Sequence, residues 1–158
     1  MKKARVFLGA VILALAASTL ADAAGPIRAG RAEAGPAALI VAAERGDPRA
    51  QTYIGFMYET GRGLPQDYVL AAQWYHRAAR QGYSRAQHML GLMYDKGQGV
   101  TQDYVQAHKW LNLAAGGSGK RDREYFLRMR NALASKMTVF QVNEAQWLAS
   151  HWWPVPER

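Results

Sequence analysis

The chain of 158 residues contains no cysteine. This absence excludes disulfide frameworks, cysteine-based zinc sites, thiol catalysis and a lipidated N-terminal cysteine. Acidic residues are also scarce, with 12 Asp and Glu against 20 Lys and Arg, so the formal net charge is +8. After residue 23 serine occurs at only four positions, none of them in a G-x-S-x-G or S-x-x-K motif. The sequence therefore offers neither a cysteine nor a serine nucleophile signature.

Histidine is sparse as well, and its spacing matches no metal motif. The four histidines are His76, His88, His108 and His151, with no HExxH motif and no i,i+4 pair among them. We therefore expect no metal, no cofactor and no catalytic residue, and we predict that the chain is not an enzyme.

The N-terminus has the pattern of a secretory signal peptide. Basic residues precede an apolar segment at 6–20, and Ala21-Asp22-Ala23 supplies the small-x-small pattern of a cleavage site. A helix of that length spans about 22 Å, which is shorter than the ~30 Å hydrocarbon core of a membrane. We predict cleavage after Ala23 and a periplasmic or secreted location. Residues 24–36, rich in Gly, Ala and Arg, are interpreted as a flexible lead-in.

An internal repeat dominates the rest of the chain. Residues 46–81 align with residues 82–117 at an offset of 36 residues, with 17 identities in 36 positions. Repeats of this length indicate stacked supersecondary units that bury their apolar faces against one another.

Each unit reads as two helices joined by a glycine-containing turn. Apolar residues recur at i, i+4, i+7 and i+8 in the first half, and Gly61 and Gly97 stand where a left-handed residue ends a helix. Asp67 and Asp103 are predicted to cap the second helices, as Asp47 caps the first. Mid-helix glycines at 55 and 91 predict close contact between the two helices of each unit.

The paired glycines Gly61-x-Gly63 and Gly97-x-Gly99 superficially match a dinucleotide-binding loop. The third glycine position holds Gln66 or Gln102, and no predicted strand precedes either copy. We interpret both as tight turns between helices.

The repeated pattern A-x3-[IL]-G-x-M-Y-[ED]-x-G-x-G-x2-Q-D-Y-V-x-A-x2-W-x3-A-A resembles the Sel-one-like repeat (SLR) family. That resemblance implies an all-α fold, a short α/α solenoid in which helix-turn-helix repeats form a right-handed superhelix with half-repeat caps. The predicted organisation is a signal peptide at 1–23, a lead-in at 24–36, an N-terminal cap helix at 37–45, repeats at 46–81 and 82–117, and a C-terminal helical cap at 118–153.

The C-terminal cap is also predicted from its own residues. Apolar residues at helical spacing predict a helix over 124–137, and Thr138 with Gln141 forms a capping-box pattern before the last helix. Related proteins often carry Pro-Glu after this Thr, where the chain has Val139-Phe140. Trp152-Trp153-Pro154 is interpreted as a hydrophobic plug on the terminal repeat, with a docking aromatic for a partner as the alternative.

Solenoids of this type bind partners on the concave face, lined by the first helix of each unit. We expect Phe56 and Leu92, at the same repeat position, to form an apolar strip there, and His88 to face outward. The alternative is an ordinary solvated face. The predicted partner-binding residues are Gln51, Phe56, Glu59, Gln87, His88, Leu92 and Asp95, with Thr52 beside them.

Basic residues concentrate in the C-terminal cap, where they form a candidate contact for an anionic surface. Nucleic acid is not expected, because an exported protein rarely meets it and no base-stacking motif is present. A solvated helix face is the plainer interpretation. The candidate residues are Lys120, Arg121, Arg123, Arg128 and Arg130, with Lys136 nearby.

The resemblance implies a scaffolding role in the cell envelope. The favoured hypothesis is an exported non-enzymatic adaptor that binds a protein or peptide of the envelope on the concave face. The alternative is an envelope-surface binder of anionic lipid, glycan or cell-wall polymer through the basic cap. Some disulfide-rich relatives are linked to β-lactam binding, but this chain lacks their cysteines.

Overall fold

The computed structural model describes residues 36–157, which form seven α-helices and no strand. The predicted signal peptide, its cleavage site and nearly all of the lead-in lie outside these residues. Among the described helices, none is both long enough and apolar enough to cross a membrane. The helices are α2 (Pro36–Glu44), α3 (Pro48–Thr60), α4 (Tyr68–Arg80), α5 (Ser84–Lys96), α6 (Tyr104–Gly116), α7 (Lys120–Ala134) and α8 (Val139–Ser150).

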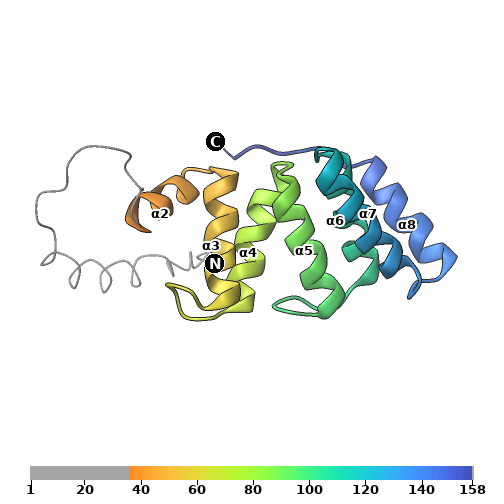
Figure 1. Cartoon of the computed structure of the whole chain (residues 1–158), viewed down its shortest axis with the longest axis horizontal. Helices are drawn as coiled ribbons and strands as arrows, with labels where there is room; N and C mark the ends of the chain where they lie inside the picture. The colour runs from red at the N-terminus through yellow and green to blue at the C-terminus, as the bar shows by residue number, and fades with distance from the viewer. Residues whose placement is uncertain (1–35, 158) are drawn as a thin grey trace, which may run out of the picture. The chain divides into compact units, whose positions relative to one another are not determined.

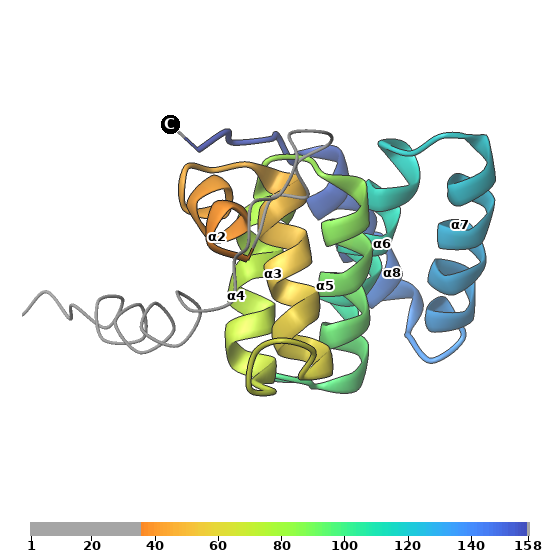
Figure 2. The ribbon, with the colours of Figure 1, turned by 60° about the vertical axis from the view of Figure 1, so that its left-hand side comes forward.

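From α2 to α7 the helices stack in chain order, each against its neighbour in the sequence (Figure 1). The last helix, α8, packs on α6. Helices α3 with α4 and α5 with α6 form the two repeat hairpins, and α7 and α8 both pack on α6. Figure 2 shows α3 and α5, the first helices of the two repeats, side by side on one face. The predicted all-α solenoid is confirmed.

Repeated caps define where the second helices begin. The carboxylate of Asp67 accepts hydrogen bonds from the backbone N–H groups of Val69 and Leu70 at 2.8 and 2.9 Å. Asp103 copies this arrangement one repeat later at 2.9 and 3.0 Å. Gly61 and Gly97 end the first helices with φ angles of 72° and 67°, in the left-handed region as predicted.

Glycine lets the helices within each repeat approach closely. A Cβ on Gly55 would lie 2.8 Å from the Tyr75 ring, and a Cβ on Gly91 would lie 3.0 Å from Leu111 Cγ. Both neighbours are fully buried residues of the second helix. The predicted close contacts are confirmed, and they explain why a residue of low helix propensity recurs in mid-helix.

The C-terminal cap differs from its prediction at both ends of α7. The helix begins at Lys120, after Gly119 in extended conformation, and ends at Ala134 rather than at residue 137. Backbone bonds from Lys136 and Met137 N–H close a tight turn there. The turn is needed because Thr138 must stay outside a helix to cap α8, where the predicted capping box with Gln141 is present.

Candidate functional site

A cleft lies between α3 and α5, on the face formed by the first helices of the repeats. Its volume is about 430 Å³. We call it the α3–α5 cleft, and it is lined by Arg49, Thr52, Tyr53, Phe56, Tyr75, Tyr83, Arg85 and Met89.

Two aromatic side chains of α3 provide the apolar surface of the cleft. Tyr53 and Phe56 are 54% and 37% exposed, and their ring centroids are 6.4 Å apart. Met89 of α5 is half-buried and lines the same cleft. Exposed aromatic rings next to a flexible thioether can bury an apolar side chain of a partner at low entropic cost.

Two arginines add positive charge to the cleft. Arg49 of α3 and Arg85 of α5 are both exposed, and they occupy the same position in the two repeats. Because a guanidinium group pairs with carboxylates through two N–H groups, this arrangement favours an acidic partner.

The tyrosine at the base of the cleft is a fixed hydrogen-bond donor. The Tyr75 hydroxyl donates to Glu59 Oε2 at 2.6 Å. Burial raises the pKa of Tyr75 far above its ordinary value, and the bond to Glu59 raises it further. The phenol therefore stays protonated, and it holds the Glu59 carboxylate that we expected to contact a partner.

The expectation that Gln51 and Gln87 lie on an accessible face is wrong. Both side chains are fully buried, and their amide nitrogens donate to the carbonyl oxygens of Ala43 and Ala79 at 3.0 and 3.2 Å. These carbonyls lie near the C-terminal ends of the preceding helices, where each also accepts a backbone N–H from the turn, of Gly46 and Gly82 respectively. The two glutamines thus connect consecutive units.

The expectation that His88 faces outward is also wrong. Its side chain is 8% exposed, stacked on Phe126 of α7 at 4.7 Å and edge-on to Tyr125 at 5.4 Å. Desolvation lowers the pKa of His88 to about 4, and the charge of Arg85 acts in the same direction. His88 occupies the repeat position of Thr52, which is likewise buried, because this position faces the first helix of the next unit.

The remaining predicted residues of the concave face are distributed differently. Phe56 lines the cleft with Thr52, whereas Leu92 is half-buried outside it. Asp95 forms an ion pair with Lys136 of the α7–α8 turn at 3.0 Å. The predicted apolar strip of Phe56 and Leu92 is therefore not a single exposed patch.

The sequence contained a signal for the residues that were missed. Arg49 and Arg85 are identical residues at one repeat position, and Tyr53 and Met89 share the position four residues later. An arginine that recurs off the apolar stripe marks a position that faces away from the core. The position of the neighbouring helix was required to show that both copies meet in one cleft.

The predicted basic surface of the C-terminal cap is partly engaged within the fold. Arg123 donates to the carbonyls of Ala115 and Gly116, and Arg130 donates to the side chain of Asn112 at 2.7 Å. The exposed members of the set are Lys120, Arg121, Arg123 and Arg128, and Arg130 is half-buried.

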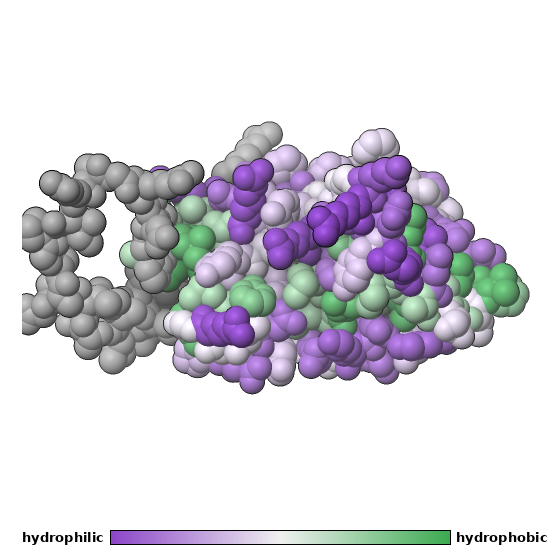
Figure 3. Space-filling view, in the orientation of Figure 1, coloured by the Kyte–Doolittle hydropathy of each residue, from purple (hydrophilic) through white to green (hydrophobic). Residues whose placement is uncertain are grey.

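Apolar residues are exposed at the same end of the stack. Val139 and Phe140, at the start of α8, are 75% and 86% exposed. Figure 3 shows a hydrophobic tip there on an otherwise largely hydrophilic face. These are the residues at which the chain departs from the Pro-Glu common in related proteins.

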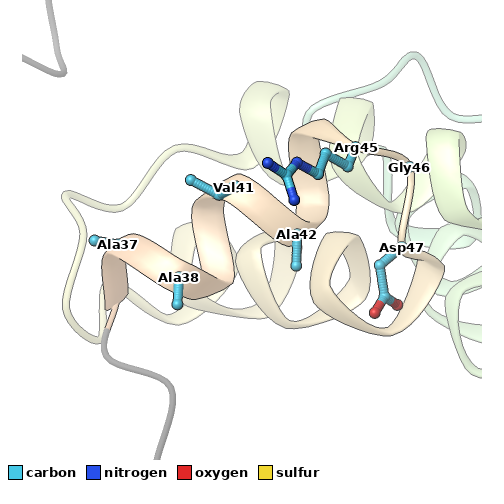
Figure 4. A pocket seen from close by; sticks show the side chains of 7 residues that line it. All are labelled: Ala37, Ala38, Val41, Ala42, Arg45, Gly46 and Asp47. Carbon is cyan, nitrogen blue, oxygen red and sulfur yellow. The ribbon is translucent and has the colours of Figure 1, made fainter.

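A wider hollow of about 770 Å³ lies over α2 and the turn after it (Figure 4). Its apolar lining is three alanines and Val41, and Arg45 and Asp47 contribute its charged groups. Asp47 already accepts hydrogen bonds from the first turn of α3. Small side chains give a surface little means to select a partner, so the α3–α5 cleft is the stronger candidate.

The chemistry of the described residues is that of a binding surface. No group of three or more His, Asp or Glu side chains within residues 36–157 is placed to hold a metal ion. The α3–α5 cleft offers aromatic area, a thioether and guanidinium groups, which together suit an acidic peptide with an apolar anchor.

Comparisons with known proteins agree with this fold. The Sel1 repeat family model matches residues 48–83 and 84–117. Sel1 repeats generally mediate protein–protein interaction, and the fold is generally a non-enzymatic scaffold. Among curated proteins, none matches the chain.

Two solved structures are similar to the chain. A protective antigen of uropathogenic Escherichia coli with an SLR fold is 36% identical, with a TM-score of 0.65, over 72% of this chain and 24% of that one. The chain thus spans about a quarter of that antigen. A Sel1 repeat protein from Oxalobacter formigenes is 42% identical, with a TM-score of 0.54, over 58% of this chain and 69% of that one. The resemblance is therefore confirmed, and the chain belongs to the Sel1 repeat family.

Proposed function

We propose that this protein is an exported, non-enzymatic adaptor that binds a protein or peptide of the cell envelope in the α3–α5 cleft. The observation that carries the proposal is that one cleft is lined by two arginines and two exposed aromatic rings. The arginines are Arg49 and Arg85, and the rings are those of Tyr53 and Phe56. The partner segment has an apolar side chain for the rings and an acidic group for the arginines.

Export is supported by the N-terminal sequence. The basic start, the apolar segment at 6–20 and Ala21-Asp22-Ala23 are the elements that signal peptidase requires. N-terminal sequencing of the protein recovered from the periplasm tests this part, with Ala24 as the expected first residue. A protein that retains Met1 in the cytoplasm would contradict it.

The binding proposal is tested by affinity capture from envelope extract with the mature chain. The variant Tyr53→Glu/Phe56→Glu places two carboxylates in the cleft and should abolish recovery of the partner. The matched control is Val69→Glu, an equally exposed apolar position on α4 outside the cleft. Circular dichroism checks that both variants are folded, and equal recovery with both would reject the cleft as the site.

The contribution of the two arginines to partner binding is tested separately. Arg49→Glu/Arg85→Glu should reduce recovery and reverse its dependence on salt, because the carboxylate of the partner then meets like charge and salt screens that repulsion. Recovery that is unchanged by this variant would remove the acidic group from the description of the partner.

A second candidate function, binding to an anionic lipid surface, is favoured by the exposed Phe140 in a cap that also presents Lys120, Arg121 and Arg128. An exposed apolar side chain and exposed basic residues on one cap suit an anionic interface. Sedimentation with anionic and with zwitterionic vesicles, at low and high salt, tests it. The variant Val139→Pro/Phe140→Glu should weaken binding to anionic vesicles, and no binding by the unmodified chain would eliminate this function.

A further inference from the structure

The C-terminal tail, residues 152–157, runs back from the end of α8 along the edge of the stack. Figures 1 and 2 both show it passing the turns at that edge and ending near α2 and the start of α3. Residues more than 100 positions apart in the sequence therefore meet at this edge, as Gln51 and Glu157 do.

A site formed by an arginine and a buried glutamine binds the carboxylate at the far end of the tail. Glu157 forms an ion pair with Arg77, with Nη2–Oε2 at 2.7 Å and Nε–Oε1 at 3.0 Å. The amide of Gln51, which is fully buried, donates to Glu157 Oε2 at 2.8 Å. Gln81 in turn donates to Gln51 Oε1 and to the carbonyl of Gly46, both at 2.9 Å. The hydrogen bonds from Gln81 therefore fix the orientation of the Gln51 amide that donates to the Glu157 carboxylate.

The rest of the tail makes the contacts of an extended peptide. The backbone N–H of Val155 donates to the carbonyl of Arg80 at 2.7 Å. Trp152 packs edge-on against Trp110, with ring centroids 6.1 Å apart. Pro154 lies over Gly82, where a Cβ would come within 3.5 Å of the proline.

The tail crosses equivalent positions of the two repeats, but it places a carboxylate at only one of them. Gly46 and Gly82 are 36 residues apart, and a Cβ on Gly46 would lie 3.0 Å from Glu157. The second repeat keeps the glutamine, as Gln87 at the position of Gln51. It has Leu113 at the position of Arg77 and Gly117 at the position of Gln81.

Beside Pro154 and Trp152, the second position retains an unfilled hollow. A hollow of about 350 Å³ is lined by Gln87, Leu113, Gly117 and Trp152, among others. Within the described part of the chain, the buried Oε1 of Gln87 has no hydrogen-bond partner. The reason is that Gly117 lacks the side-chain amide that Gln81 provides one repeat earlier. A buried acceptor without a donor is costly, so a ligand that brings an N–H group here gains affinity.

The tail itself is suited to exchange with such a ligand. Trp153, Pro154, Val155 and Pro156 are all exposed, so the tail covers the edge without being enclosed by it. Its prolines favour an extended backbone before binding, which lowers the entropic cost of docking.

We propose that this edge is a second binding site, separate from the α3–α5 cleft, for an extended peptide of a partner protein. The peptide carries one carboxylate for Arg77 and Gln51, and proline or apolar residues over Gly82. A backbone N–H of the peptide reaches Gln87 Oε1. The tail occupies the site in cis until such a peptide replaces it.

The probe for this proposal is a fluorescently labelled synthetic peptide of residues 150–157. In the full mature chain, Glu157→Lys places a cation next to Arg77 and releases the tail. A tethered occupant competes at an effective concentration in the millimolar range. Fluorescence anisotropy should therefore show at least ~10-fold tighter binding of the peptide to Glu157→Lys than to the unmodified chain.

The carboxylate site is tested in the tail-released background. Arg77→Met keeps a long aliphatic side chain and removes the guanidinium group, whose carbon lies 4.6 Å from the centroid of the Trp74 ring, and it should abolish peptide binding. Arg62→Met is the matched control, because Arg62 is exposed in the α3–α4 turn away from the tail. A peptide with Gln in place of Glu157 should bind at least ~10-fold more weakly, because the charge-assisted bonds to Arg77 are lost.

Three outcomes would overturn the proposal. The first is equal peptide affinity for the unmodified and tail-released chains, and the second is binding that Arg77→Met leaves unchanged. The third is a concentration-dependent dimer of the unmodified chain that exchanges tails, which would assign the edge to a second copy. The cleft variant Tyr53→Glu/Phe56→Glu should keep peptide binding, so failure at one site is distinguishable from failure at the other.

Discussion

The side-chain amide of Gln51 donates to the backbone carbonyl of Ala43 at 3.0 Å, and this bond recurs every 36 residues. Gln87 and Arg123 each donate to the carbonyl eight residues earlier, at 3.2 and 3.0 Å. The acceptor is always near the end of the preceding helix, in α2, α4 and α6. The bond therefore links consecutive units, and it places the start of α7 in the same register as the starts of α3 and α5.

We predict that Gln87→Met lowers the free energy of unfolding by about 0.5–1.5 kcal/mol, because the carbonyl of Ala79 loses one of its donors and keeps the backbone N–H of Gly82 at 3.0 Å. Methionine is similar in size to glutamine, so little packing is lost. Urea denaturation followed by circular dichroism measures the change. Gln73→Met, at an exposed position of α4, is the control and should change stability little. A neutral Gln87→Met would mean that the bond between units contributes nothing.

Most of the local structure could be predicted from the sequence. The aspartate caps at 47, 67 and 103, the left-handed glycines at 61 and 97, and the capping box at 138–141 depend on residues a few positions apart. Such features are readable because the interacting groups are adjacent in the chain.

The binding surface was only partly predictable. The helical pattern separates core from surface within one repeat, but it does not show which surface positions the next unit covers. His88 and Gln87 were misplaced for this reason, since α7 and the end of α4 cover them. The contact of Glu157 with Arg77 spans 80 residues, and no local pattern indicates it.

The close contact at Gly55 gives a second prediction. Gly55→Ala should destabilise the fold by about 1–3 kcal/mol, because the added methyl group would overlap the buried Tyr75 ring at 2.8 Å. Gly116→Ala is the matched control in α6, where nothing lies within 4 Å of the added Cβ. That change should be neutral or stabilise the helix by up to about 1 kcal/mol. Thermal unfolding of the two variants measures the contrast, and equal midpoints would refute the steric argument.

The buried His88 predicts loss of stability in acid. Burial lowers the pKa of His88 from 6.5 to about 4, so the unfolded chain binds a proton in this range and the folded chain does not. Stability is therefore retained above pH 6.5 and is lost as the pH falls towards 4. The difference in pKa corresponds to about 3 kcal/mol.

This contribution can be isolated with His88→Thr, which copies the residue at the same position of the first repeat. The unfolding free energy of each protein is measured by urea denaturation at several values from pH 7 to pH 4. The variant should lose less stability over this range than the unmodified chain, whatever its stability at pH 7. Parallel pH profiles would show that His88 is not held neutral in the fold.

The two adjacent tryptophans at the start of the tail should differ in their effect. Trp152 is half-buried against Trp110 and packs on the core cluster of α4 and α5, whereas Trp153 is 78% exposed. Full truncation of a buried tryptophan costs about 3–5 kcal/mol, so a half-buried one should cost about 2 kcal/mol. Trp152→Ala is therefore expected to lower stability by about that amount. Trp153→Ala is expected to change stability by less than about 0.5 kcal/mol.

Thermal and urea unfolding of the two variants measure this difference. The interpretation of the segment as a hydrophobic plug then applies to Trp152 alone, and Trp153 is left as the exposed aromatic that a partner can contact. If Trp153→Ala were as destabilising as Trp152→Ala, both rings would belong to the plug. If neither substitution were destabilising, the two rings would contribute nothing to the stability of the fold. The contacts of Glu157 and Val155 would then hold the tail at the edge.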